Sequence, residues 1–215
     1  MILFIDTETT GLVQFPLPHD HPSQPDLVQL GMVLCDDDGA ERAAVELIVK
    51  PDGYTIPRSA SDVHGITTET ALRCGVSRQV AVAMFANLRK IADSVAAHNL
   101  PFDERVLATA LHRAGKTTPL EGPIKRICTL ELCEPVLKLP ATERMRAAGR
   151  ANQYKKPNLG ECVRYFFGED LPNTHTALAD ARACARIYFQ VVLKGGARID
   201  RSPVGRALHW IRSRR

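Results

Sequence analysis

Residues 2–12, ILFIDTETTGL, form the stretch on which the fold prediction depends. Its apolar first part, residues 2–5, is typical of a buried strand and is followed at once by Asp6 and Glu8. Side chains alternate along a strand, so these two carboxylates share one face. Like charges at this spacing make each other harder to ionise unless a positive group lies between them. The pair therefore indicates either a bound cation or a strand end that faces solvent.

The composition of the whole chain is that of a globular, water-soluble protein. It has 215 residues, of which 45% are hydrophobic and 24% charged, enough for a compact domain with a sizeable core. No apolar run approaches the roughly 20 residues that span a bilayer, and the N-terminus turns acidic too early for a signal peptide. We therefore expect a cytoplasmic protein without a membrane partner.

Charge and cysteine content leave the partner open. The net charge of +4 and the pI of about 8.8 are compatible with a polyanionic partner but do not require one. The six cysteines form no C-x-x-C pair, and none has a histidine at zinc-finger spacing. We predict that all are reduced thiols: Cys35, Cys74, Cys128, Cys133, Cys162 and Cys184.

The order of predicted elements indicates an α/β fold with a mixed sheet flanked by helices. A strand at 1–6 is followed by a Pro-rich surface loop and then by an antiparallel hairpin over 27–49, with its turn at the DDDG cluster. Further strands are expected at SVAAH and PIKRICT. Helices are predicted at 68–73, 77–92, 100–114, 131–137, 158–167 and 176–193. Strands that alternate with helices after a hairpin favour a sheet with both antiparallel and parallel pairs.

Two of the remaining segments carry specific predictions. The segment 77–92 is predicted to be a helix, because apolar residues recur there at helical spacing: Val80, Met84, Leu88 and Ile91. Residues 138–157 are polar, basic and interrupted by Gly and Pro, which predicts a loop.

A third carboxylate, Asp180, lies on the apolar face of the helix predicted from residue 176. It shares that face with Cys184, Ile187 and Val191. A carboxylate on a face that packs against a sheet is costly unless it is paired or bound to a metal. His175 is five residues earlier and is expected just before the helix, beside the carboxylate.

Asp103 is a fourth candidate, because AHNLPFDE places it in the first turn of a helix that follows a strand. Stabilisation of the helix dipole would explain it equally well, together with its neighbour Glu104. An α/β sheet can bring all three segments to one end, where four carboxylates and a histidine would converge. Oxygen ligands suit Mg²⁺ or Mn²⁺ rather than zinc, and two such ions about 4 Å apart form the site of many nucleases.

Four segments, in this order, resemble the successive motifs of the DnaQ-like 3′–5′ exonucleases: FIDTETTGL, VHGIT, AHNLPFD and HTALADARACARIY. The last segment has H-x4-D, which is typical of the DEDDh branch, and not the Y-x3-D of its sister branch. This branch includes the proofreading epsilon subunit of bacterial DNA polymerase III and RNase T. The resemblance covers about residues 1–193, and KKPNLGECVRYFFGED is similar to the family's lead-in to its third motif.

The resemblance implies a ribonuclease-H-like fold with an exonuclease domain at 1–193. Residues 194–215 are predicted from their composition to form a basic C-terminal tail. It implies two Mg²⁺ ions, replaceable by Mn²⁺, with Asp103 often acting through a water and His175 as the general base. The implied metal-site carboxylates are Asp6, Glu8, Asp103 and Asp180. The implied substrate-binding residues are Thr7, Thr9, Thr10, Gly11, Leu12, His64, Asn99 and Phe102.

The implied activity is release of nucleoside 5′-monophosphates from the 3′ end of single-stranded or frayed nucleic acid, with DNA favoured. Trimming of RNA 3′ ends is the alternative within the same chemistry. A non-catalytic nucleic-acid-binding module or a polymerase accessory subunit is the alternative of another class, and a DNA polymerase is a candidate partner. No clamp-binding peptide and no extended polymerase-binding domain is evident in the sequence.

Three further stretches are rich in basic residues or histidine. Lys138, Arg144, Arg146, Arg150, Lys155 and Lys156 would either hold substrate phosphates or form a solvated loop. The basic tail would make non-specific phosphate contacts. His19, Asp20 and His21 are interpreted as solvated loop residues rather than a metal site.

Overall fold

A computed structural model describes residues 1–116, 124–171 and 176–195, without the side chains of residues 192 and 193. The chain divides into two compact units. The first comprises Met1–Thr129 and Asn173–Arg186, and the second comprises Leu130–Pro172 and Ile187–Arg215. The predicted boundary at residue 193 stays a prediction, and most of the predicted tail lies outside the described residues.

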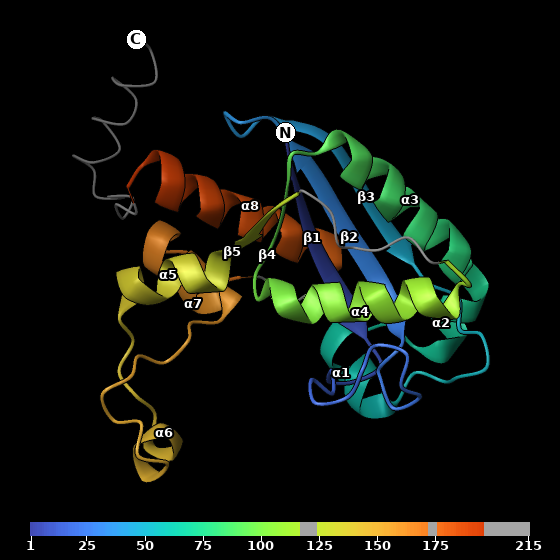
Figure 1. Cartoon of the computed structure of the whole chain (residues 1–215), viewed down its shortest axis with the longest axis horizontal. Helices are drawn as coiled ribbons and strands as arrows, with labels where there is room; N and C mark the ends of the chain where they lie inside the picture. Colours follow the sequence, from blue (N-terminus) through green and yellow to red (C-terminus); the bar gives the residue numbers. More distant parts are fainter. Residues whose placement is uncertain (117–123, 172–175, 196–215) are drawn as a thin grey trace. The chain divides into compact units, whose positions relative to one another are not determined.

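The first unit is built on a five-stranded sheet in the order β3-β2-β1-β4-β5 (Figure 1). β1 pairs antiparallel with β2, and β2 antiparallel with β3, whereas β4 is parallel to both β1 and β5. The predicted mixed sheet and its hairpin are confirmed. The strands are β1 (Ile2–Thr9), β2 (Leu27–Cys35), β3 (Glu41–Ile48), β4 (Ser94–Ala97) and β5 (Lys125–Cys128).

The central strand β1 is longer than predicted, because it continues past residue 6 to Thr9. Its partner β2 stays in register, with Asp6 opposite Gly31 and Glu8 opposite Gln29. β-Branched Thr7 and Thr9 favour the extended conformation between and after the acids. Both carboxylates are therefore held by the ladder of the sheet instead of lying in a loop beyond it.

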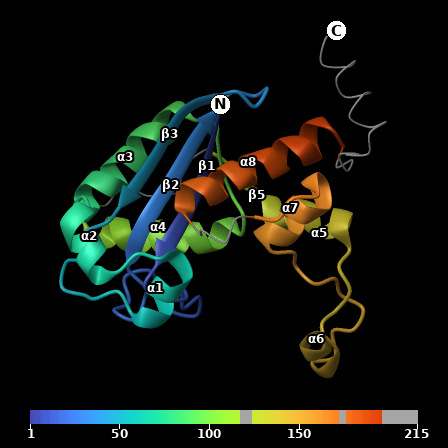
Figure 2. The ribbon, with the colours of Figure 1, turned by 180° about the vertical axis from the view of Figure 1, so that it is seen from behind.

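Helices α3 (Arg78–Ile91) and α4 (Leu100–Arg113) cover one face of the sheet, and the first half of α8 (Ala177–Leu193) covers the other (Figures 1 and 2). Alternation along β1 explains the two faces: Leu3 and Ile5 belong to the core cluster under α3 and α4. The even-numbered residues of β1 consequently face α8. The predicted helices at 100–114 and 176–193 are confirmed to within one residue at each end.

The predicted helix α3 is confirmed, but most of the apolar residues whose spacing predicted it do not face the core. Val80, Met84 and Ile91 are 49%, 39% and 56% exposed, whereas Val82 and Phe85 are buried. The helix carries two apolar stripes side by side, and periodicity alone does not say which faces the sheet. The stripe with small Ala81 and with Val82 allows the closer approach, because packing favours contact without voids.

The segment 52–75 contains two helices, of which only α2 (Thr68–Cys74) was predicted. α1 (Arg58–His64) follows Pro57 and ends at Gly65, whose φ of 74° gives a left-handed C-cap. With seven residues and buried side chains only at Ala60 and His64, α1 has too little apolar periodicity to be recognised in the sequence.

The second unit contains most of α5 (Thr129–Leu137), α6 (Glu143–Ala147), α7 (Leu159–Phe167) and the end of α8. α7 begins with a capping box, in which Asn158 and Glu161 bond to each other's backbone N–H. α6 was not predicted and lies within the expected loop 138–157. None of its side chains is buried, so no apolar pattern marks it.

The described part of the chain contains no helix with the length and apolarity needed to cross a membrane. All six cysteines are free, as predicted, and four of them are buried.

Candidate active site

Asp6 and Glu8 project from the face of β1 that α8 covers. The approach of α8 depends on Gly31 in β2, because a Cβ there would lie 2.1 Å from the Ala177 carbonyl carbon. The Gln29 side chain accepts a hydrogen bond from the Ala177 N–H at 3.0 Å and so caps the start of the helix. Asp180 is three residues further on and is only 8% exposed. β2 therefore positions the helix that carries the third carboxylate.

The three carboxylates form a compact cluster. One oxygen from each of Asp6, Glu8 and Asp180 lies within 4.8 Å of the others. Cys184, one turn after Asp180, is buried as predicted. Within residues 1–116, 124–171 and 176–195, this is the one group of three or more His, Cys, Asp or Glu residues close enough to hold a metal ion.

Asp103 reaches the same end of β1 from α4. Its carboxylate accepts a hydrogen bond from the Thr7 hydroxyl at 2.8 Å, and the residue is 2% exposed. The turn into α4 is made by Asn99, whose φ of 76° lies in the left-handed region that few non-glycine residues other than Asn adopt. Because Asp103 is buried, stabilisation of the helix dipole is not sufficient to explain a carboxylate at this position.

The electrostatics of the cluster follow from burial and from like charge. Burial raises the pKa of Asp6 well above its usual value, and the charges of Asp103, Asp180 and Glu8 raise it further. Burial, with a contribution from Asp180, raises the pKa of Glu8 to about 7. Burial raises the pKa of Asp103 to about 8 against the opposing hydrogen bond from Thr7. Without a counter-charge, this site holds protons near neutral pH.

The donor set fits a hard divalent cation. All the candidate ligand atoms in the cluster are carboxylate oxygens, which Mg²⁺ and Mn²⁺ accept and which differ from the His and Cys ligands typical of zinc. A cation would also favour the ionised carboxylates, against the burial and the like charges that raise the pKa values of Asp6 and Glu8.

Comparison of the sequence with models of protein families gives a match over most of the chain. The family model described as an exonuclease, RNase_T, matches residues 3–188, which is most of the chain. The chain is a member of this exonuclease family. The predicted resemblance to DnaQ-like 3′–5′ exonucleases is thereby confirmed.

Individual relatives agree with this assignment. The chain is 25% identical over 195 residues to the DNA polymerase III subunit epsilon of Buchnera aphidicola, covering 90% of this chain and 73% of the relative. Its fold matches E. coli exonuclease I in complex with a dT13 oligonucleotide, with a TM-score of 0.69 and 20% identity over 88% of this chain. The zinc-bound form of an E. coli exonuclease I–single-stranded DNA complex matches with a TM-score of 0.69 and 18% identity over 91% of this chain. This chain spans 40% and 41% of the length of those two exonuclease I chains.

The residues that the resemblance assigns to substrate binding lie in varied environments. Leu12 is 79% exposed, and Phe102 packs partly against the core. Three threonine hydroxyls make bonds within the protein: Thr7 donates to Asp103, Thr9 donates to the Gly11 carbonyl at 2.6 Å, and Thr10 accepts from the Asp26 N–H at 2.9 Å. These hydroxyls shape the end of β1, whereas Leu12 is presented to solvent.

The structure describes His64 but not His175. His64 is buried, its Nδ1 accepts from the Ile66 N–H at 3.1 Å, and burial lowers its pKa. The proton of this neutral imidazole is therefore on Nε2. His175 lies outside the described residues, so its predicted role stays a prediction. His19 and Asp20 are exposed, in agreement with the solvated-loop interpretation.

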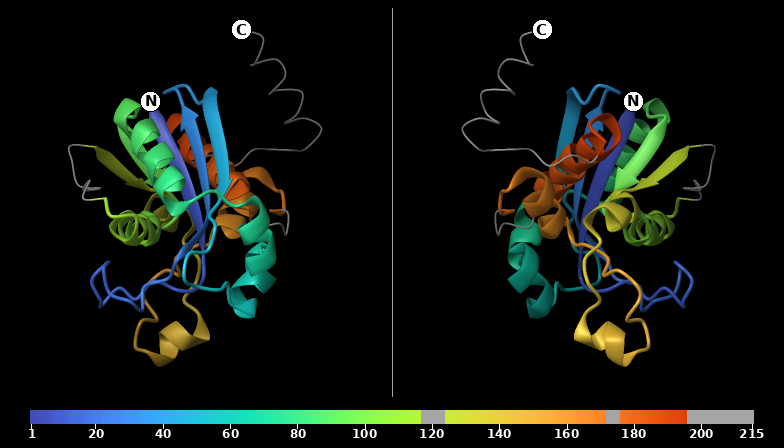
Figure 3. Two further views of the ribbon diagram at one scale, coloured as in Figure 1. Left: turned by 90° about the vertical axis from the view of Figure 1, so that its right-hand side faces the viewer. Right: turned by 90° about the vertical axis from the view of Figure 1, so that its left-hand side faces the viewer.

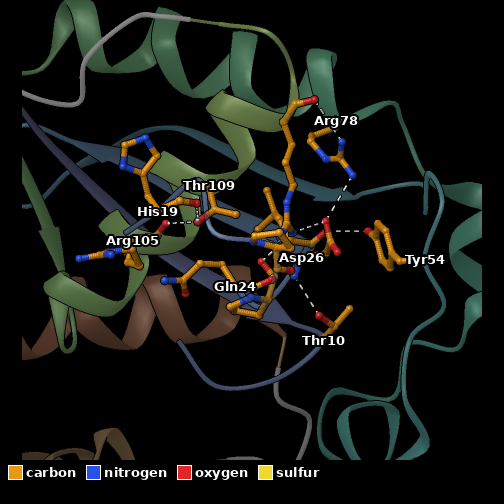
Figure 4. Close-up of polar contacts among 12 residues, drawn as sticks. Thr10, His19, Gln24, Asp26, Tyr54, Arg78, Arg105 and Thr109 are labelled. Carbon is orange, nitrogen blue, oxygen red and sulfur yellow. Dashed lines mark hydrogen bonds and ion pairs between the residues drawn. The ribbon is translucent and has the colours of Figure 1, made fainter. Parts of the chain in front are cut away.

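Sequence reasoning missed the residues that hold the loop after β1. Gln24 is buried inside the loop. Arg105 and Thr109 of α4 donate to backbone carbonyls of the loop (Figure 4). Arg113 of α4 does the same. These three residues recur at every fourth position of α4. This polar stripe on a helix next to a Pro-rich loop was the signal available in the sequence.

Proposed function

We propose that this exonuclease removes nucleoside 5′-monophosphates, one at a time, from the 3′ end of single-stranded or frayed DNA. In this proposal Asp6, Glu8, Asp103 and Asp180 hold two Mg²⁺ ions, which Mn²⁺ replaces. The observation that carries the proposal is the compact cluster of half-buried and buried carboxylates in a member of an exonuclease family.

The chain's own residues have separate tasks in this chemistry. Asp6 and Glu8 on β1 and Asp180 on α8 supply the negative charge that binds the cations, and Thr7 orients Asp103. When bound, two such cations would activate the attacking water and stabilise the leaving 3′ oxygen. His175 would accept the water's proton as general base, a role that rests on the resemblance of HTALAD to the family motif.

A free single-stranded 3′ end is the substrate class that the surroundings of the cluster favour. Leu12, highly exposed and three residues after β1, offers an apolar surface against which a base can pack. The matching exonuclease I structures contain dT13 and dA16 oligonucleotides, which supports DNA over RNA. RNA trimming stays the alternative substrate for the same site.

Contact with the strand's phosphates is proposed for the basic residues of 138–156. Arg144, Arg146 and Arg150 are exposed and have no ion pair with any other described residue. Lys155 differs, because it pairs with Glu161. We therefore remove Lys155 from the candidate phosphate contacts. Lys138 and Lys156 are also exposed and complete the set.

Digestion of four labelled substrates side by side tests the proposal. These are linear single-stranded DNA, duplex DNA with a mispaired 3′ end, short RNA, and circular single-stranded DNA. With 5′ label and Mg²⁺, we expect a ladder that shortens by one nucleotide at a time on the first two, slower digestion of RNA, and an intact circle. Cleavage of the circle at a comparable rate would overturn the exonuclease direction, and faster digestion of RNA would overturn the DNA preference.

A DNA polymerase partner is a second candidate, favoured by the similarity to a polymerase III epsilon subunit. Co-migration of the purified chain with a bacterial replicative polymerase on gel filtration would support it. Separate elution at micromolar concentration would contradict it.

A further inference from the structure

The loop between β1 and β2 is organised by one buried side chain. Gln24 is 3% exposed, and its amide group bonds to the opposite limb of the loop. Its Oε1 accepts from the Gln14 N–H at 3.1 Å, and its Nε2 lies 2.9–3.1 Å from the carbonyl oxygens of Gln14, Leu17 and Pro18. A segment without strand or helix pairing thus has its backbone groups satisfied from inside.

α4 fastens the outer side of the same loop (Figure 4). The Thr109 hydroxyl donates to the His19 carbonyl at 2.9 Å, and Arg105 donates to the Leu17 carbonyl. Arg113 donates to the Gln24 carbonyl at 2.8 Å and forms an ion pair with Asp26 at 2.7 Å. Because these three side chains are four residues apart, one face of α4 holds the second half of the loop, from Leu17 to Asp26. The first half is joined to it by the bonds between Gln24 and Gln14.

The base of the loop is joined to the end of β1. Asp26 accepts a backbone bond from the Thr10 N–H at 3.0 Å, and the Asp26 N–H donates to the Thr10 hydroxyl. The buried guanidinium of Arg78 pairs with the Asp26 carboxylate at 3.3 Å. Figure 3 shows this loop at the end of β1 where the chain leaves the sheet. The position of the loop is therefore tied to the strand that carries Asp6 and Glu8.

The fastened loop exposes large apolar side chains. Leu12 is 79% and Phe15 51% exposed, whereas Val13 between them is buried. A preorganised binding surface needs apolar side chains that the backbone already holds in place. Such a surface loses little conformational freedom when a ligand binds. The faces of nucleic-acid bases match such groups, and stacking on aromatic side chains tolerates any sequence.

Chain length keeps this surface close to the carboxylates. Leu12 is four residues beyond Glu8, so even an extended chain separates the two by about 14 Å at most. Phe15 is seven residues beyond Glu8, which limits that separation to about 25 Å. We propose, on the basis of the proposed function, that residues 12–18 form a base-stacking platform. In it, Phe15 contacts a base upstream of the 3′-terminal nucleotide, and Gln24 is the residue that positions Phe15.

Substitution of Phe15 tests the stacking contact. The probes are a fluorescent ten-nucleotide single strand and the p-nitrophenyl ester of thymidine 5′-monophosphate, which has no upstream base. In Phe15→Ala we expect the Kd for the strand, measured by anisotropy without divalent cations, to rise about 5- to 100-fold. The kcat/KM for the strand relative to that for the ester should fall by a similar factor. Phe15→Tyr should restore both values, and Val63→Ala, which truncates an exposed apolar residue on α1, should change neither.

Gln24→Glu tests the positioning role, because an acceptor would then face three carbonyl oxygens. We expect faster amide exchange in 13–25, the same selective loss on the strand substrate, and no additional loss when it is combined with Phe15→Ala. A melting temperature close to that of the parent protein would show that the rest of the fold is retained.

The outcomes separate the platform from the catalytic proposal. An unchanged Kd in Phe15→Ala, an equal loss on the strand and on the ester, or no binding of the strand by the parent protein would overturn the platform. A parent protein that binds the strand through Phe15 but does not digest it would overturn the proposed function and leave the platform standing.

Discussion

The acidic cluster and the basic arm both gather like charges, but they do so in opposite surroundings. The acidic cluster is Asp6, Glu8, Asp103 and Asp180, of which Asp103 and Asp180 are buried. The basic arm is residues 139–155, closed at its base by a hydrogen bond from the Lys155 N–H to the Leu139 carbonyl at 3.0 Å. Its arginines at 144, 146 and 150 are all exposed.

The difference shows which of the two needs a bound partner. Removal from water, and then the charges of neighbouring carboxylates, raise the pKa values of Asp6 and Glu8, so the cluster is destabilising at neutral pH unless protons or cations bind. Exposed guanidinium groups are screened by water and salt, so the arm is stable alone. We infer that the cluster acts on a cation and the arm on a polyanion.

The arm's shape is maintained by caps rather than by a core. The Thr142 hydroxyl accepts from the Met145 N–H at 3.2 Å at the start of α6. At its end Gly149 has a φ of 72°, and the Arg150 N–H reaches the Met145 carbonyl at 2.8 Å. This Schellman arrangement satisfies the last carbonyls of a helix that buries no side chain.

The largest effect is expected from Asp180→Asn. It preserves shape but removes a charge from the acidic cluster, and a catalytic cation contributes several kcal/mol. We expect the single-turnover rate on a single-stranded oligonucleotide to fall about 10⁴-fold or more, at about tenfold per 1.4 kcal/mol. Asp62→Asn, at an exposed acid on α1, is the matched control and should keep the parent rate. A loss of less than tenfold in Asp180→Asn would remove the acidic cluster from the mechanism.

His175→Ala should reduce the rate less, because all four carboxylates remain. Loss of a general base typically costs about 10²–10⁴-fold. Metal binding by calorimetry should persist, and the rise in rate across roughly pH 6–7 should disappear. If this variant lost metal as completely as Asp180→Asn, or kept the low-pH step, the general-base role would be wrong.

Removal of charge from the basic arm should weaken binding about tenfold at moderate salt. We expect replacement of Arg144, Arg146 and Arg150 by Gln to flatten the plot of log Kd against log salt for single-stranded DNA. Each lost phosphate contact should reduce its slope by about 0.7. Arg58, Lys90 and Lys116, also exposed, are the matched triple control. An unchanged slope would show that the arm is a solvated loop.

The smallest effect concerns the stability of the metal-free protein. Because the pKa values of Glu8 and Asp103 are raised to about 7 and about 8, the folded state binds more protons than the unfolded state between about pH 4 and pH 8. Stability should therefore fall as pH rises through that window, by at least about 5 °C in melting temperature. Asp103→Asn should flatten the dependence, and Mg²⁺ at pH 8 should reverse the loss. A melting temperature in chelator that rises between pH 5 and pH 8 would contradict the raised pKa values.

Local sequence patterns were sufficient for the parts of the site that lie on regular elements. Alternation placed Asp6 and Glu8 on one face of β1, and helical spacing placed Asp180 with buried Cys184 on α8. They were insufficient where distant contacts decide. The pairing of β1 with β2 up to Thr9 and the choice of buried stripe on α3 both depend on neighbours far along the chain.

The same reason explains why Gln24 and α6 were missed. Gln24 makes its bonds to backbone carbonyls, which no side-chain pattern encodes. α6 is a five-residue helix defined by caps and not by apolar periodicity.

The exonuclease rate as a function of free divalent cation tests the central claim most directly. The protein is stripped with chelator, and digestion of a 5′-labelled single strand is followed while Mg²⁺, Mn²⁺ or Zn²⁺ is restored. We predict no digestion in chelator, saturable recovery with Mg²⁺ or Mn²⁺, and no specific gain with Zn²⁺. Full digestion after exhaustive chelation would contradict the assignment of the acidic cluster to a metal-dependent exonuclease site.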